Sequence, residues 1–371
     1  MRGLFTILAI VLLSPSGAAM AQGTLKIGFA GALLGNLSSY GSSNLYGVEF
    51  AVADVNSKGG VAGKQVELVI EDDSCDPTLA TAAAAKLLSA GIGHVLGHTC
   101  SGATASALEV YGNKAIVMSS SATEVSLTES GRYPRFFRTT PRDDVQGGVI
   151  LGLIKKRGFK KVAILHDGSD HGMTLAAFVE NGLKSDPSVG AAVVLSEGPV
   201  SGRSSSREAA ARVKNSGADA LFWGGYHVDG AKLAENLGDI NARVVIVGAD
   251  GLFDERFIRL GGPDVEGSYV TGQAPPPESP AAGEALEYHR KNRAEESGTY
   301  FFHAAGAAQA LFSAIGKAGD PSDPELVKRH LTEDTVPTVM GPVRFDSKGD
   351  IIGGAFNLYR VKNGKFLEVS P

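Results

Sequence analysis

Short apolar segments alternate along this chain with longer segments in which apolar residues recur at helical spacing. The run at 25–30 (LKIGFA) is typical of a buried strand, and Val48, Val52 and Val55 then mark one face of a helix over 45–56. The same pattern predicts strands at 65–71, 94–97, 115–119, 161–166, 191–195, 220–223 and 244–248, and helices at 77–90, 103–111, 143–157, 173–184, 207–216 and 230–237. This alternation favours parallel sheets covered by helices on both faces.

The alternating pattern occurs twice, and the two series join near residue 140. Further on, the pattern predicts helices at 282–296 and 301–317, and strands at 356–361 and 365–369. A chain of 371 residues is longer than one hydrophobic core normally serves. We therefore expect two α/β lobes, the first from 22–140 and 272–345 and the second from 141–271 and 346–371. Ligands of open α/β sheets bind outside the carboxyl ends of strands, so the cleft between the lobes is the expected site.

The first 21 residues have the features of a secretory signal peptide. Arg2 precedes an apolar run at 4–13, and the small-x-small sequence Ala19–Met20–Ala21 predicts cleavage after Ala21. We therefore expect a periplasmic protein. In such an oxidising compartment the two cysteines of the chain, Cys75 and Cys100, are predicted to form a disulfide bond.

The charge balance argues against a nucleic-acid partner. The 35 basic and 40 acidic residues give a net charge of −5, and no basic cluster is longer than 155–157. No apolar stretch after the first 21 residues approaches the length of a membrane span.

Motifs for cofactor or catalytic chemistry are weak. Gly28, Gly31 and Gly35 lack the dinucleotide-binding spacing, and the segment 36–39 is not expected to open a helix. His94 and His98 lie near Cys100, but the disulfide is a better use of that cysteine than zinc. Neither a cofactor nor a metal is therefore expected.

Ser169, Asp170 and His171 are consecutive and could suggest a hydrolase. Neighbouring side chains point apart, however, so a catalytic triad is not expected there. A surface turn that contributes to a ligand cleft is the preferred interpretation.

Two hydroxyl-rich segments follow predicted strands of the first series. Thr99–Gly102 lies between a strand and a helix and predicts Ser101 as the N-cap of that helix, beside backbone N–H groups that suit a carboxylate. Ser119–Thr123 likewise offers hydroxyls and amides after a strand. Because both segments lie at carboxyl ends of strands in the same half, they indicate an anion-binding end of a ligand site.

Several ordered segments resemble the leucine/isoleucine/valine-binding proteins of ABC importers, which are type I periplasmic binding proteins. The segments that carry the resemblance are 28–32 with 40–41, 51–60 (AVADVNSKGG), 72–77 (DDSCDP), 97–101, 162–167 (VAILHD), 224–227 (GGYH), 335–342 and 346–350. This resemblance implies two Rossmann-like lobes with parallel central sheets, joined by a multi-strand hinge in a "Venus flytrap". It also implies capture of a free amino acid and its delivery to ABC permease subunits by a monomeric, non-enzymatic protein.

The resemblance also implies a set of ligand-binding residues: Tyr40, Ser101, Ser121, Ala122, Thr123, His171, Tyr226, Asp250 and Tyr300. Ser101 and nearby backbone N–H groups would bind the ligand carboxylate. The carbonyl of Ser121, the hydroxyl of Thr123 and the carboxylate of Asp250 would bind its ammonium. The tyrosines would line an apolar pocket for a branched side chain.

Three positions depart from the family pattern. Asp250 stands where the family has a glutamate, His171 where it has a tyrosine, and Tyr300 where it has a phenylalanine. The last two changes add polarity, so a polar or smaller amino acid is an alternative ligand. A ligand sensor of the same fold, and a hydrolase that uses His171 with Ser169, are the alternative functions.

Overall fold

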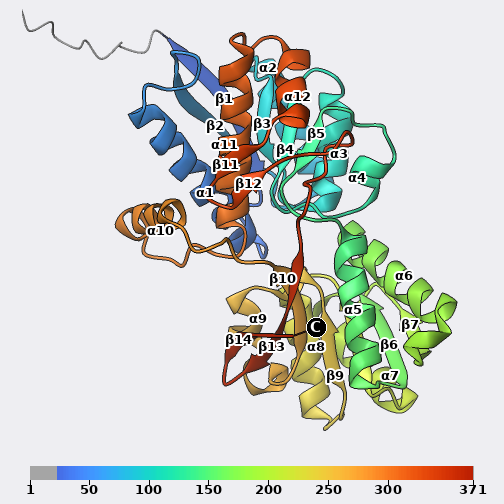
Figure 1. Cartoon of the computed structure of the whole chain (residues 1–371). Coiled ribbons are helices and arrows are strands. Elements are labelled where there is room, and N and C mark those ends of the chain that lie inside the picture. The colour runs from blue at the N-terminus through green and yellow to red at the C-terminus, as the bar shows by residue number, and fades with distance from the viewer. Residues whose placement is uncertain (1–22, 371) are drawn as a thin grey trace, which may run out of the picture.

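The computed structural model describes residues 23–370, which form two α/β lobes, one above the other in Figure 1. The predicted two-lobed α/β fold is thereby confirmed, whereas the exact lobe boundaries stay a prediction. The predicted signal peptide and its cleavage site lie outside the described residues. Within residues 23–370, no helix has the length and apolar character needed to cross a membrane.

The first lobe contains a parallel sheet of five strands in the order β2-β1-β3-β4-β5. These strands are β1 (Thr24–Gly31), β2 (Gln65–Asp72), β3 (His94–Gly97), β4 (Ile116–Ser119) and β5 (Phe136–Arg138). The helices of this lobe are α1 (Ser38–Ser57), α2 (Pro77–Ser89), α3 (Ser101–Tyr111), α4 (Ser126–Glu129), α11 (Phe301–Ala318) and α12 (Pro324–Glu333). The short strands β11 (Val336–Thr338) and β12 (Gly341–Val343) form an antiparallel pair.

Both faces of this sheet are buried, which explains its continuous apolar strands. Ile27 and Phe29 belong to the core cluster that includes residues of α1 and α11, whereas Ala30 belongs to the cluster that includes α2 and α3. Neighbouring residues of a strand point to opposite faces, so both helical layers pack on the same few strands.

The second lobe contains a sheet of seven strands in the order β14-β13-β10-β9-β8-β6-β7. Its strands are β6 (Lys161–His166), β7 (Ala192–Glu197), β8 (Ala220–Gly224), β9 (Val245–Gly248), β10 (Tyr269–Gln273), β13 (Phe356–Lys362) and β14 (Lys365–Val369). Its helices include α5 (Asp143–Arg157), α6 (Asp170–Ser185), α7 (Gly202–Ser216), α8 (His227–Asp239) and α9 (Glu255–Gly261). Strand β13 pairs antiparallel with both β10 and β14, whereas the other pairs of this sheet are parallel.

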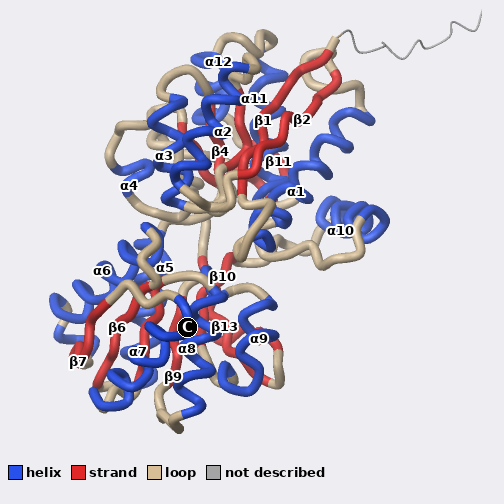
Figure 2. Tube along the Cα trace, turned by 180° about the vertical axis from the view of Figure 1, so that it is seen from behind, coloured by secondary structure: helices blue, strands red, loops and turns tan. Residues whose placement is uncertain are grey.

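The chain crosses between the lobes after β5, after β10 and after β12 (Figure 1). The view from behind shows these connections grouped at the lobe boundary, with α10 (Pro280–Asn292) beside α1 (Figure 2). This grouping forms a multi-strand hinge of the predicted kind.

The start of α1 differs from the expectation. The segment 36–39 was not expected to open a helix, yet α1 begins at Ser38. Its first turn packs so closely that a Cβ on Gly41 would collide with the backbone of Ala32. Because this contact is tertiary, it carries no periodic signal in the sequence. Strand β10 and helices α9 and α12 were also not predicted.

Candidate functional site

Residues from the carboxyl ends of strands in both lobes line one cavity between the lobes. The first lobe contributes Ser101 at the start of α3, and Ser121 and Thr123 after β4. The second lobe contributes its lining residues after β6, β8 and β9. The complete lining is Tyr40, Thr99, Cys100, Ser101, Ser121, Thr123, His171, Tyr226, Asp250, Gly251 and Tyr300.

The structure therefore brings together the site residues predicted from the sequence, with Ala122 as the exception. Ala122 packs in the core of the first lobe, and its N–H donates to Ser119 Oγ at 3.0 Å. Its carbonyl accepts from Arg138. Ala122 therefore packs in the core next to the lining residues and does not line the cavity itself.

The end of the cavity in the first lobe is rich in hydrogen-bond donors. Ser101 is the first residue of α3, and the N-cap is Cys100 rather than the predicted Ser101. The first N–H groups of α3 have no partner within the helix and carry its positive dipole end. The hydroxyl of Ser101 accepts from the N–H of Glu124 at 3.3 Å and keeps its own proton for another acceptor. The hydroxyl of Ser121, in contrast, bridges the carbonyl of Thr99 and the amide of Asn44 at 2.8 and 2.9 Å. This end suits a carboxylate, with Ser101 as its hydroxyl donor.

Asp250 provides negative charge from the second lobe, and its side chain is almost completely buried. Its Oδ1 accepts from Gln146 Nε2 at 3.0 Å, and its Oδ2 accepts from Gln273 Nε2 at 3.1 Å and the hydroxyl of Tyr300 at 3.0 Å. Burial raises the pKa of Asp250, although the charge of His171 opposes this shift. These neutral donors orient the carboxylate without cancelling its charge.

His171 lies between two carboxylates. Its Nδ1 is 3.5 Å from Asp143 Oδ2 and its Nε2 is 3.6 Å from Asp250 Oδ1. Nδ1 also lies 3.2 Å from the hydroxyl of Thr123. Burial by itself would lower the pKa of His171, but Asp143, and after it Asp250, raise this pKa to about 9. The two carboxylates therefore favour the protonated form of the ring.

Asp143 and Gln146 were not predicted as site residues. Both lie in the first turns of α5, where the sequence predicted only a helix over 143–157. Gln146 donates to Asp143 as well as to Asp250, so it ties the two carboxylates together. The serines were predicted because they follow the carboxyl ends of strands. The same reasoning could have found Asp143, because α5 follows the carboxyl end of β5.

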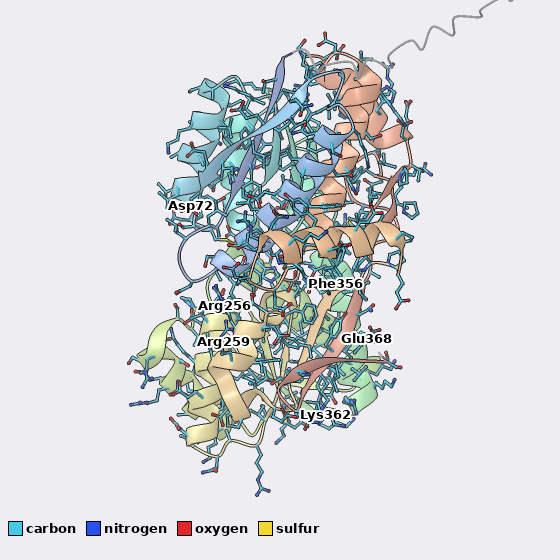
Figure 3. The ribbon with its side chains drawn as sticks, turned by 90° about the vertical axis from the view of Figure 1, so that its left-hand side faces the viewer. Asp72, Arg256, Arg259, Phe356, Lys362 and Glu368 are labelled. Atoms are coloured by element: carbon cyan, nitrogen blue, oxygen red, sulfur yellow. A yellow bond between two sulfur atoms is a disulfide. The ribbon has the colours of Figure 1, made fainter. Side chains whose placement is uncertain are left out.

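Tyr40 connects the lobes directly. Its hydroxyl donates to the carbonyl of Gly251 at 2.8 Å and lies 2.8 Å from His227 Nδ1. On the same side of the molecule, Arg256 on α9 reaches Asn36 and Ser38 of the first lobe, and Figure 3 shows it at the lobe boundary. The lobes are therefore closed over the cavity.

Comparison with known proteins identifies the family. A model of the family described as "Periplasmic binding protein" matches residues 24–365. The chain belongs to the periplasmic binding proteins.

Relatives of this periplasmic binding protein include the Leu/Ile/Val-binding protein of Escherichia coli K12, 31% identical over 360 residues and 96% of each chain. A leucine-, isoleucine-, valine-, threonine- and alanine-binding protein of Pseudomonas aeruginosa is 31% identical over 342 residues, covering 92% of this chain and 90% of that protein.

The predicted resemblance is also confirmed among solved structures. The isoleucine complex of the branched-chain amino acid transporter substrate-binding protein LivJ from Streptococcus pneumoniae has a TM-score of 0.82 at 26% identity, with 94% of this chain and 100% of that chain covered. A 4-hydroxybenzoate-bound solute-binding protein from R. palustris has a TM-score of 0.82 at 20% identity, with 94% and 96% covered. At 20% identity, the similarity to the R. palustris protein shows the shared fold alone.

The other chemistries considered for this periplasmic binding protein find little support in the site. The hydroxyl of Ser169 caps α6 and donates to Asp167 at 2.6 Å, so it is not directed at His171 as a nucleophile would be. The named relatives are binding proteins rather than enzymes. Near the predicted strand at 94–97, Cys100 forms the predicted disulfide with Cys75, and His98 lies 2.6 Å from Asp73.

Asp143, His171 and Asp250 are close enough to share a metal ion, since one ligand atom of each lies within 4.8 Å of the others. A protonated imidazole cannot coordinate a metal, however, and the two carboxylates hold the proton on His171. At neutral pH a proton therefore competes directly with any metal ion here.

Proposed function

We propose that this periplasmic binding protein captures a free amino acid between its lobes and delivers it to the permease subunits of an ABC importer. The observation that carries the proposal is the separation of two kinds of polar group across one closed cavity. The donors around Ser101 belong to the first lobe, and the carboxylate of Asp250 belongs to the second. A zwitterion that satisfies both ends at once binds the closed state better than the open state.

The walls between the two polar ends favour an apolar side chain. The rings of Tyr226 and Tyr300 lie 6.0 and 5.7 Å from the ring of Tyr40, and all three residues line the cavity. Burial raises the pKa of each of these tyrosines well above the usual range, so the walls stay neutral. Together with the relatives that bind leucine, isoleucine and valine, these walls support a branched-chain ligand.

We place the protein in the periplasm as a monomer, after cleavage of its signal peptide following Ala21. The family and its periplasmic relatives support this location. Closure brings surfaces of both lobes into one arrangement, which is the form that a permease would distinguish from the open protein.

The test is a thermal-shift screen with protein that has been unfolded and refolded to remove bound ligand. The twenty amino acids are added separately, and positive results are measured by calorimetry. A large increase in Tm with leucine, isoleucine or valine is expected. Stabilisation by polar or small amino acids alone would overturn the branched-chain assignment, and no response to any amino acid would overturn the proposed function.

A further inference from the structure

His171 occupies the place where the ligand ammonium is expected. The two side-chain acceptors assigned to that ammonium are the hydroxyl of Thr123 and the carboxylate of Asp250. His171 Nδ1 lies 3.2 Å from the first, and its Nε2 lies 3.6 Å from the second. The ring is 3% exposed, and Nε2 is buried without a hydrogen-bond partner among the described residues. The closed protein therefore already places a cation between these acceptors.

Three carboxylates act on the ring of His171, and the charge of each favours its protonated form. Asp143 on α5 and Asp250 after β9 face its two nitrogens. Asp167 follows β6, and its carboxylate accepts from the backbone N–H groups of Ser169 and Tyr226 while its charge also favours the protonated ring. Among the described residues that line the cavity there is no Lys or Arg.

An ammonium bound to Asp250 would lie next to Nε2 of His171, in a site closed to water. Two like charges this close disfavour each other, so the presence of the ammonium lowers the affinity of the ring for its proton. Asp250 is already the acceptor for Gln146, Gln273 and Tyr300, which leaves one lone-pair direction on Oδ1. His171 Nε2 lies 3.6 Å from this Oδ1.

We propose that the ligand ammonium and the proton of His171 compete for the carboxylate of Asp250, so that an amino acid binds with release of this proton. The proposal rests on the proposed function, because it requires a ligand that carries an ammonium group. His171 is then a specificity-determining residue. A carboxylate that lacks the amino group binds without releasing the proton, whereas an amino acid is favoured as the pH rises.

The expected pH dependence follows from linkage. The free site holds the proton up to a pKa of about 9, and the complex does not hold it. Below this pKa the affinity for leucine should therefore rise about tenfold per pH unit, or roughly 100-fold from pH 6 to pH 8. About one proton should be released per leucine bound at pH 7.

The direct test is NMR spectroscopy of protein labelled with ¹⁵N-histidine, with and without leucine. The His171→Gln variant assigns the His171 signals. An imidazolium at pH 7 without leucine and a neutral ring with leucine are expected. Calorimetry in two buffers of different ionisation enthalpy should report one released proton with leucine and none with 2-hydroxy-4-methylpentanoate, which lacks the ammonium.

The His171→Gln variant tests whether the released proton comes from His171 or from another group. It keeps a hydrogen-bond donor and Asp250 but removes the imidazole. If the ring stays protonated in the leucine complex, or the released proton persists in His171→Gln, the competition is refuted. If leucine and all other amino acids fail to bind at every pH, the proposed function fails and this inference fails with it.

Discussion

Replacing Asp250 by asparagine should change ligand affinity and stability in opposite directions. The substitution keeps the size of the side chain but removes its charge. The ligand ammonium then loses a charge-assisted hydrogen bond, which contributes about 1.5–3 kcal/mol. Because 1.4 kcal/mol corresponds to a factor of ten, the Kd should rise roughly 10- to 150-fold.

The ligand-free protein, in contrast, should become more stable at pH 7. Burial raises the pKa of Asp250, so the fold disfavours its ionised form, and the cost is present above the folded-state pKa. The variant leaves Asp143 and His171 as a balanced pair. Gln273 can turn its amide to accept from the new asparagine, since its Oε1 has no partner among the described residues.

Calorimetry measures the affinity, and thermal unfolding without ligand measures the stability. Asp54→Asn is the matched control, because Asp54 forms a surface pair with Lys58 far from the cavity and should change neither quantity appreciably. An unchanged Kd for Asp250→Asn would refute its assignment to the ammonium. A lower Tm without ligand would refute the argument from burial.

The remaining predictions concern the disulfide, the lobe contact and two buried groups. Cys75→Ser opens a loop with a sequence separation of 25 and should lower stability by about 3 kcal/mol in urea unfolding, with ligand preference unchanged. Tyr40→Phe removes hydrogen bonds between the lobes and should weaken ligand binding by about 1–2 kcal/mol in calorimetry, whereas an unchanged Kd would show that they do not hold closure. Asp350→Asn leaves the buried Arg138 without its ionic partner and should cost about 3–5 kcal/mol of folding free energy; a loss below 1 kcal/mol would contradict this. Burial lowers the pKa of His303 to about 4, so stability should fall as the pH drops from about 6.5 to 4, and His303→Gln should reduce that fall.

The local pattern was sufficient to predict most of the fold and one side of the site. Parallel strands such as β1 and β8 are buried on both faces, so their apolar runs are continuous and easily recognised. The carboxyl ends of such strands meet at one edge, which is why Ser101 and Thr123 could be predicted to lie together. The disulfide followed from the compartment and the cysteine count.

The rest of the site depends on contacts that the local pattern does not encode. Gln273 lies in β10, whose sequence Tyr269–Gln273 includes Thr and Gly and lacks an apolar run. This strand is buried because the crossover brings β13 against it. Gln146 lies on a helix with weak amphipathic character. Its amide becomes part of the site only because Asp250, which follows β9, lies beside it and donates its N–H to Gln146 Oε1. The hydroxyl of Ser121 contacts Asn44 and Thr99 within the first lobe, and these three residues come from segments that the local pattern does not bring together.

Two kinds of residue control affinity in this closed cavity, and they act on different steps. In the proposed function Asp250 contacts the ligand itself, so its loss should weaken the complex directly. Tyr40 and His227 favour the closed state whether or not a ligand is present. A ligand shifts the equilibrium only by its differential affinity for the two states, so strong lobe contacts raise the apparent affinity but reduce the change that binding produces. A carrier that must signal occupancy to a permease therefore needs most of its closure energy to come from the ligand.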